Sequence, residues 1–214
     1  MKLPVRALLL FLLGFLLGCV FLAALTGIRS AQSQPPAQEA AQPLDPDDTA
    51  SLLSAAADAA SYLRDRDYPS LAAMVHPERG VAFTPYSSVD PEMDQNFSSE
   101  EIAYAAENEK RYLWGYTDGR GSPIWMTISE FMDSYIFSQD YTQAPQVAVD
   151  EIRISGNALE NLTQAYPGCR FVEFSYPGID PVMEGMDWCS LKLVFQPGET
   201  QWLLVGIIHS QWTI

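Results

Sequence analysis

Residues 191–209 read Leu-Lys-Leu-Val-Phe-Gln-Pro-Gly-Glu-Thr-Gln-Trp-Leu-Leu-Val-Gly-Ile-Ile-His, and this stretch decides the fold class. Two runs rich in β-branched and aromatic residues flank Pro197-Gly198-Glu199-Thr200, which has the composition of a turn. The stretch therefore predicts two strands of an antiparallel sheet. In the first run Leu191, Leu193 and Phe195 share one face.

The second run is apolar on both faces. Strict alternation places Leu203, Val205, Ile207 and His209 on one face, and Trp202, Leu204, Ile208 and Trp212 on the other. A strand with two apolar faces is covered on both sides. We therefore expect this strand to be central in its sheet or to line a closed cavity.

Helix signals dominate the chain before this sheet. Aspartates at 45, 47 and 48 precede apolar residues at helical spacing, and a shorter helix follows Asp67. Capping boxes at Ser98–Glu101 and Thr127–Glu130 begin two more helices. Further strands are expected at 80–86, 111–116, 123–126, 147–154 and 170–176. This order predicts an α+β domain with helices packed on one side of a curved antiparallel sheet.

The first 29 residues predict a signal anchor, a single transmembrane helix. Ala7–Ile28 is a run of 22 residues without a charge. At about 1.5 Å per residue it spans roughly 33 Å, enough to cross a bilayer. Lys2 and Arg6 favour a cytoplasmic N-terminus, which places the rest of the chain outside the cytoplasm.

Two alternatives for this segment stay open. Leu16-Leu17-Gly18-Cys19 is similar to a bacterial lipoprotein processing site, which would leave a lipidated Cys19 as the N-terminus. Ordinary secretion with cleavage is the other alternative. In all three cases residues 30–44, rich in Pro, Gln and Ala, form a flexible linker, and residues 45–214 form an extracytoplasmic domain.

The charge is strongly asymmetric. The whole chain has 12 basic and 27 acidic residues, a net of −15. Lys2, Arg6, Arg29 and Glu39 precede residue 44, so 9 basic and 26 acidic residues remain, a net of −17. A domain this acidic repels phosphate backbones and anionic membrane surfaces, and we expect no nucleic-acid partner.

Four motifs spread over the domain carry a family resemblance. They are Val75-His76-Pro77-x-x-Gly80-Val81-x-Phe83-x-Pro85-Tyr86, Tyr112-Leu113-Trp114-Gly115, Glu184-Gly185-Met186-Asp187-Trp188, and Leu204-Val205-Gly206-Ile207-Ile208-His209-x-x-Trp212-Thr213-Ile214. The chain resembles uncharacterised exported proteins and lipoproteins of Gram-positive bacteria with an NTF2-like, cystatin-like cone. The resemblance implies an exported location and that cone. No activity is assigned to that family, so no catalytic residue follows from it.

A loop after Tyr86 is similar to a calcium-binding loop. Asp90, Glu92, Asp94, Asn96, Ser98 and Glu101 occupy positions 1, 3, 5, 7, 9 and 12 of a twelve-residue loop. Gln95 replaces the glycine usual at position 6, and a strand precedes the loop instead of a helix. The simpler interpretation is an acidic loop that leads into a capped helix.

His209 is the candidate general base, with Asp187 and Tyr86 as possible partners in a cone-shaped pocket. The alternative is a packed, hydrogen-bonded structural histidine. The sequence has no nucleophile elbow, phosphate loop or zinc signature, which argues against an enzyme.

Cys169 and Cys189 are an even pair in an oxidising compartment, which favours a disulfide. Each lies at the start of its strand, and a simple hairpin puts those starts about 20 Å apart. A disulfide needs Cα atoms within about 7 Å, so a different strand order or a folded-back 177–188 loop would be required.

Aromatic residues suggest either a pocket or a core. Trp114, Tyr116, Trp202 and Trp212 are candidate pocket residues, with Trp125 and Trp188 as further members. Three functional hypotheses follow. The first is a membrane-tethered module that binds a ligand or an envelope partner; the others are a pocket enzyme that uses His209 and a calcium-stabilised sensor or adhesion module.

Overall fold

The structure is a computed structural model that describes residues 43–213. The predicted anchor, Cys19 and the linker up to residue 42 lie outside these residues. None of the described helices is long and apolar enough to span a membrane. Leu44, assigned to the linker by its composition, already donates its backbone N–H to the Glu199 carbonyl at 2.8 Å.

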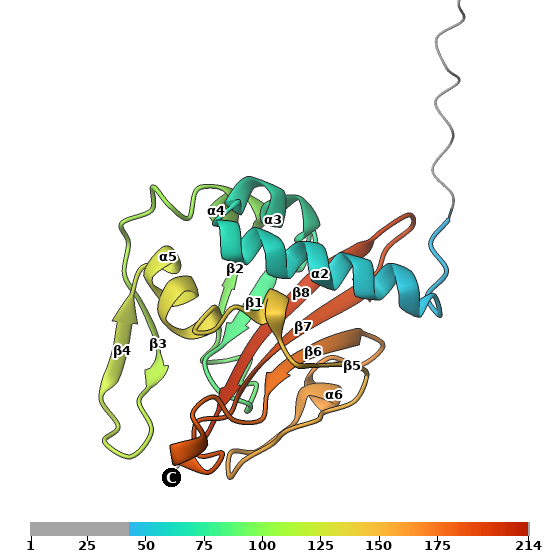
Figure 1. Ribbon diagram of the computed structural model, residues 1–214. Coiled ribbons are helices and arrows are strands. Elements are labelled where there is room, and N and C mark those ends of the chain that lie inside the picture. Colours follow the sequence, from blue (N-terminus) through green and yellow to red (C-terminus); the bar gives the residue numbers. More distant parts are fainter. Residues whose placement is uncertain (1–42, 214) are drawn as a thin grey trace, which may run out of the picture. The chain divides into compact units, whose positions relative to one another are not determined.

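The domain consists of short helices and two sheets (Figure 1). The α-helices are α2 (Thr49–Asp65), α3 (Tyr68–Met74), α4 (Ser99–Ala103), α5 (Ile128–Phe131) and α6 (Leu162–Ala165). A π-helical turn continues α5 over Met132–Ile136, and 3₁₀ turns lie at Tyr141–Gln143 and Pro181–Met183. The strands are β1 (Val81–Thr84), β2 (Gln95–Phe97), β3 (Tyr112–Tyr116), β4 (Pro123–Met126), β5 (Gln146–Val149), β6 (Arg170–Tyr176), β7 (Cys189–Pro197) and β8 (Trp202–Gln211).

Six strands form the main sheet in the order β2-β1-β8-β7-β6-β5, and β3 and β4 form a separate pair. The expected α+β class is confirmed, and β8 is an inner strand as its two apolar faces predict. The expectation of a wholly antiparallel sheet is wrong, because β1 pairs with β8 in parallel. Most of the chain separates these two strands, so no hairpin turn fixes their relative direction.

The register between β7 and β8 shifts after Val194, which leaves Val205 as an extra residue in β8. Such a β-bulge breaks strict alternation. Leu204 therefore lies with Ile207 in the core beneath the helices, and Val205 lies with Ile208 on the opposite face. The predicted grouping of Val205 with Ile207 is wrong for this reason.

The two faces of the main sheet have different covers. The larger core joins the sheet to α2, α3, α4 and α5, and Figure 1 shows α2 lying across the strands. The smaller core joins the sheet to α6 and the loops beside it. Its apolar members are Val89, Leu162, Tyr166, Phe171, Val194, Val205 and Ile208. Helices thus pack mainly on one side, as predicted, and a thinner layer covers the other.

The caps read from the sequence are formed. Ser98 and Glu101 make a reciprocal capping box at α4, and Thr127 and Glu130 do the same at α5. Two elements are shorter than predicted. Helix α4 ends at Ala103 instead of near residue 109, and β5 ends where Asp150 adopts a left-handed φ of 54°.

Candidate functional site

A partly enclosed pocket lies on the sheet face that α6 covers. Its volume is about 160 Å³, and its lining residues are Arg79, Ala82, Val89, Pro91, Asp94, Asn96, Ala165, Tyr166 and Val205. Strands β1, β2 and β8 form its floor, and α6 with the chain after it forms one wall. The bulge in β8 contributes directly, because it turns Val205 toward this face. Three larger depressions elsewhere on the domain are open to solvent.

Asp94 supplies the negative charge of the pocket. It lies just before β2, opposite Thr84 of β1, and its Oδ2 accepts hydrogen bonds from the Thr84 hydroxyl at 2.5 Å and the Asp90 N–H at 3.1 Å. Both bonds end on the same oxygen, Oδ2. None of the lysines and arginines in residues 43–213 forms an ion pair with this carboxylate.

Burial raises the pKa of Asp94 from its ordinary value of 3.8 to about 6, and the hydrogen bonds from Thr84 and Asp90 only partly oppose this. The carboxylate is therefore mostly ionised at neutral pH but pays a desolvation penalty. A carboxylate that lines a pocket and whose ionised form is destabilised by burial is typical of a functional position.

Arg79 supplies the positive charge. Its guanidinium lies over the Tyr166 ring, with 5.1 Å between Cζ and the ring centroid, and it donates to Gln196 Oε1 at 3.3 Å and contacts Cys169 Sγ at 3.6 Å. No described carboxylate lies within ion-pair distance of Arg79. Arg79 and Asp94 thus line one pocket without pairing with each other.

Tyr166 and Asn96 complete the polar lining. Burial raises the pKa of Tyr166 to about 12, so its hydroxyl keeps its proton at neutral pH. Asn96 donates to the Arg79 carbonyl at 3.1 Å and so fixes the backbone that carries the guanidinium. Gly80 is required beside it, because its φ is +72° and a Cβ there would lie 2.4 Å from Asn96 Oδ1.

The predicted calcium loop does not gather its oxygen atoms. Asp94 bonds Thr84, Asn96 bonds the Arg79 carbonyl, and Glu101 caps α4. Asp90 accepts from the Glu92 N–H within the loop. Within residues 43–213 no three His, Cys, Asp or Glu side chains are placed to hold a metal ion. Strand β2 explains the difference, because Gln95–Phe97 is extended and paired with β1, so this part of the chain does not curl around an ion.

His209 is fully buried. Its Nδ1 lies 3.2 Å from the Pro85 carbonyl and its Nε2 lies 3.4 Å from the Ser138 hydroxyl. Burial lowers the pKa of His209 to about 4, so the ring is neutral at physiological pH and a weak base. This matches the packed, hydrogen-bonded interpretation.

The polar groups of the proposed partners of His209 bond to other parts of the chain. Asp187 accepts the backbone N–H groups of Ile179 and Asp180 within an exposed loop. The Tyr86 hydroxyl accepts the Asp118 N–H at 3.3 Å and lines a different, open depression. The structure therefore does not bring the predicted catalytic set together.

Cys169 and Cys189 are both free thiols. Strands β6 and β7 form the simple hairpin in which Tyr176 faces Cys189 and Arg170 faces Phe195, so the two cysteines lie at opposite ends. The predicted disulfide is not formed for this geometric reason. Burial raises the pKa of both thiols.

The candidate aromatic residues do not share one pocket. Trp114 stacks on Phe131 at 3.8 Å between ring centroids, and Trp202 is buried with its Nε1 donating to Ser51 at 2.9 Å. Tyr116 and Trp212 are exposed at separate depressions. Aromatic side chains thus fill the space between helices and sheet where a cone pocket was expected.

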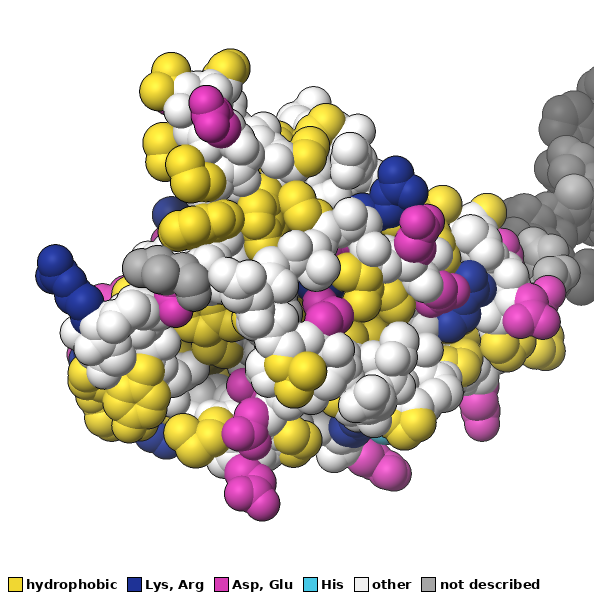
Figure 2. Space-filling model, turned by 90° about the horizontal axis from the view of Figure 1, so that it is seen from below, with side chains coloured by type: hydrophobic (Ala, Val, Ile, Leu, Met, Phe, Trp, Pro, Cys, Tyr) yellow, Lys and Arg dark blue, Asp and Glu magenta, His cyan; other side chains and the backbone are white. Residues whose placement is uncertain are grey.

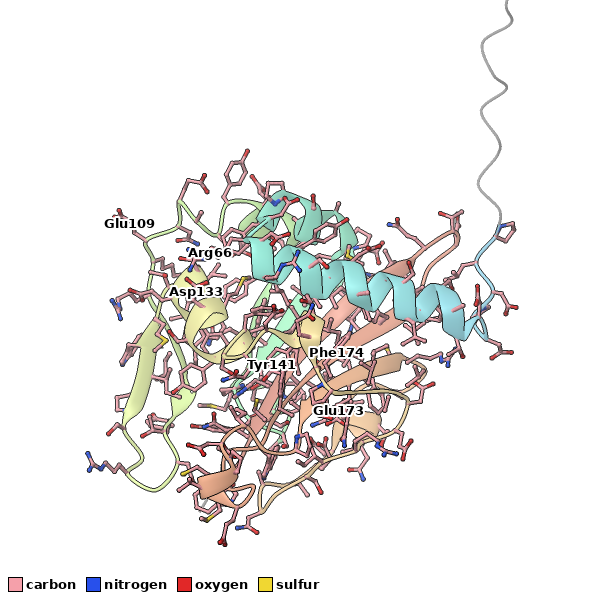
Figure 3. The ribbon with its side chains drawn as sticks, viewed as in Figure 1. Arg66, Glu109, Asp133, Tyr141, Glu173 and Phe174 are labelled. Atoms are coloured by element: carbon pink, nitrogen blue, oxygen red, sulfur yellow. The ribbon has the colours of Figure 1, made fainter. Side chains whose placement is uncertain are left out.

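Sequence reasoning missed a buried ionic cluster next to the smaller core. Lys192 is 0% exposed, and its Nζ lies 2.8 Å from Glu160 Oε2, 2.8 Å from the Ser210 hydroxyl and 3.8 Å from Glu173 Oε1. Burial raises the pKa of Glu173, against the effect of the Arg153 N–H and Lys192. Figure 3 labels Glu173 and its neighbour Phe174 on β6. Charged residues in an otherwise apolar strand were the only sequence signal for this cluster.

Known proteins similar to this chain were sought by sequence and by structure. No family model matches the sequence, and no curated protein matches it. Among solved structures, one described as a calcium/calmodulin dependent protein kinase II association domain from Xanthomonas campestris is similar over 76% of this chain and 84% of that chain. The sequence identity is 10% and the TM-score is 0.32, too low to assign a fold family or a function to this chain.

Proposed function

We propose that this chain is a membrane-tethered extracytoplasmic binding domain whose pocket takes a small zwitterion. The observation that carries the proposal is the pair of opposite charges, Asp94 and Arg79, that line one pocket without neutralising each other. A ligand with an ammonium and a carboxylate group satisfies both. Free amino acids are the simplest compounds of this class.

The size of the pocket supports a small ligand. Its volume of about 160 Å³ is below the roughly 300–1,000 Å³ of pockets that hold drug-sized molecules. The floor contributes the short apolar side chains Ala82 and Val205, which suits a small aliphatic group. Tyr166 and Asn96 add polar groups to the lining. The class of ligand is therefore a small aliphatic amino acid or a compound of the same charge and size.

Binding has more support than catalysis. The base candidate His209 is buried, burial lowers its pKa to about 4, and it is not among the residues that line the pocket. The zwitterion pocket itself is lined by no histidine, cysteine or serine. Asp94 and Arg79 are groups that hold charge, and the pocket contains no pair of groups arranged for nucleophilic attack.

The location and the fold family belong to the same proposal. The uncharged run Ala7–Ile28 with Lys2 and Arg6 before it supports a single-pass anchor with the domain outside the cytoplasm. The motifs that resemble exported Gram-positive proteins with an NTF2-like cone agree with this location. Helices that precede a long sheet and cover one of its faces support the relation to that cone.

The test is thermal denaturation of the soluble domain with three probes: glycine, acetate and methylammonium. Acetate offers the negative group alone and methylammonium the positive group alone. A ligand of the native state raises the melting temperature in proportion to the logarithm of its concentration over Kd. We expect glycine, and small aliphatic amino acids, to stabilise the domain more than either half-probe at equal concentration.

Two variants with matched controls assign the effect to the pocket. Asp94→Asn and Arg79→Gln are each expected to abolish the glycine shift, whereas Glu92→Gln and Arg120→Gln remove exposed charges of the same sign and leave it intact. Equal shifts by all three probes, or a glycine shift that survives both pocket variants, would contradict the proposal.

A further inference from the structure

The loop between β6 and β7 displays apolar side chains to solvent. Val182 is 83% exposed, and Ile179, Met183, Met186 and the nearby Trp212 are 40% to 47% exposed. Figure 2 views the domain from the side where the C-terminus lies and shows hydrophobic side chains on that surface between scattered acidic ones. We call residues 177–188 together with Trp212 the apolar loop surface. Single exposed apolar residues are common on protein surfaces, but a cluster of large ones is typical of an interaction site.

The backbone of this loop is held in one shape by its own hydrogen bonds. Asp187 lies inside the loop and accepts the Ile179 N–H at 3.1 Å and the Asp180 N–H at 2.6 Å. Asp180 in turn accepts the Val182 N–H at 2.9 Å, and a 3₁₀ turn spans Pro181–Met183. Gly185 closes the turn at a φ of +84°.

This arrangement is the reverse of an ordinary surface loop. The carboxylates of Asp180 and Asp187 satisfy backbone N–H groups, and the apolar side chains are the ones left toward solvent. Because the loop shape is preset, little ordering is needed when a partner binds, which favours association. The loop is attached to the sheet through the Trp212 N–H, which donates to the Trp188 carbonyl at 3.1 Å.

A depression at the base of the loop can receive a side chain. Its volume is about 320 Å³, and Ile179, Met186 and Trp212 are among the residues that line it. Ser138, Gln139, Asp187 and Gln211 contribute polar groups to its lining. The surface thus combines exposed apolar side chains with a recess that apolar and polar groups line together.

The charged residues of the loop and of the depression are all acidic. Asp180, Glu184 and Asp187 lie within the loop, and no lysine or arginine occurs between Arg170 and Lys192. A second copy of the chain would bring the same carboxylates together, and an anionic lipid surface would be repelled. Only a partner with basic groups beside its apolar side chains complements both features.

We propose that the apolar loop surface docks a protein segment that carries apolar side chains next to lysine or arginine. The site lies apart from the zwitterion pocket and shares no residue with it. The segment inserts one apolar side chain into the depression beside Trp212, packs others on Val182 and Met186, and places its cations near Asp180 and Glu184. The affinity then comes from apolar burial and the rate of association from the charges.

The test measures binding of a synthetic amphipathic helix of leucine and lysine to the soluble domain by calorimetry. The double variant Val182→Ser/Met186→Ser keeps the charge of the domain and is expected to weaken binding by about tenfold or more, as expected for the loss of two buried apolar groups. The control Leu53→Ser changes a leucine on α2 that is 37% exposed and is expected to leave Kd within about twofold. Unchanged melting temperatures of the variants confirm that the fold is intact.

Three results would overturn the proposal. Equal binding by the double variant would show attraction by net charge alone. Binding of the domain to zwitterionic or anionic lipid vesicles, lost in the double variant, would assign the surface to a membrane. Concentration-dependent dimerisation in ultracentrifugation, lost in the same variant, would assign it to a second copy.

Discussion

Asp94 reduces the stability of the folded domain at neutral pH. Burial raises its pKa to about 6 from 3.8, so the folded state binds the proton more tightly than the unfolded chain does. The contribution of Asp94 to stability is therefore greatest below about pH 4 and decreases as pH rises through 6. A position that reduces stability is retained for function in many proteins.

We expect Asp94→Asn to stabilise the domain at pH 7 while it abolishes ligand binding. The amide keeps an oxygen for the Thr84 hydroxyl but carries no charge to desolvate. The gain is roughly 1–2 kcal/mol, since one pKa unit corresponds to about 1.4 kcal/mol and part of the side chain is solvated. Urea denaturation at pH 4 and pH 7 checks this, because the gain is expected to vanish at pH 4. A loss of stability at pH 7 would contradict it.

Lys192 has the opposite role, as the buried cation on which two carboxylates depend. Replacement by Met leaves Glu160 and the fully buried Glu173 without their partner, and breaking a buried pair costs about 3–5 kcal/mol. Equilibrium denaturation of Lys192→Met gives the value. The control Arg64→Met removes an exposed pair with Asp65 and is expected to change stability by less than about 0.5 kcal/mol. A near-neutral Lys192→Met would show that the cluster is solvated.

At the scale of the element, most helices and strands could be predicted from the sequence, but the pairing and register of the strands could not. Helix α2 and the two capping boxes follow from local patterns, because caps and apolar periods act within a few residues. The bulge at Val205 depends on the register with β7, and the parallel pairing of β1 with β8 depends on contacts between distant segments. Neither leaves a local signal.

The pocket could not be predicted for the same reason. Arg79, Asp94, Tyr166 and Val205 come from four separate parts of the chain, and only the sheet order and the bulge bring them together. The spacing of acidic residues in the 90–101 loop predicts Asp94 and Asn96 as calcium ligands. In the structure Asp94 instead bonds Thr84, and Asn96 bonds the Arg79 carbonyl. The contacts of these two side chains depend on the pairing of β2 with β1, which has no local signal in the sequence.

The substitution Gly206→Ala tests whether close packing of β8 against Tyr166 positions α6. A Cβ at this position would lie 2.7 Å from the Tyr166 hydroxyl oxygen, so Gly206→Ala forces the ring and α6 to shift. Overpacking of this kind costs about 1–3 kcal/mol. We expect both a lower free energy of unfolding and a weaker glycine shift in thermal denaturation. A variant with wild-type stability and wild-type ligand response would show that the Tyr166 ring moves away from position 206 at little cost.

At the scale of the whole molecule, the acidic domain and the apolar N-terminal run predict a tethered protein. In cells, the chain is expected to fractionate with membranes and to lose its domain when intact cells are treated with protease. Cys19→Ala separates the alternatives for the anchor, since a transmembrane helix keeps the protein in the membrane fraction and loss of lipidation releases it or blocks its processing. Recovery of the full-length chain in the cytosolic fraction would contradict the extracytoplasmic location.

The central claim is that Asp94 and Arg79 hold the two charges of one small ligand. A crystal structure of the domain grown with L-alanine tests this most directly. We expect the ammonium group within hydrogen-bond distance of Asp94 Oδ1, the carboxylate at the Arg79 guanidinium, and the methyl group on Val205 and Ala82. A pocket that holds only water at saturating L-alanine, with an Asp94 carboxylate that contacts no ligand, would contradict the account.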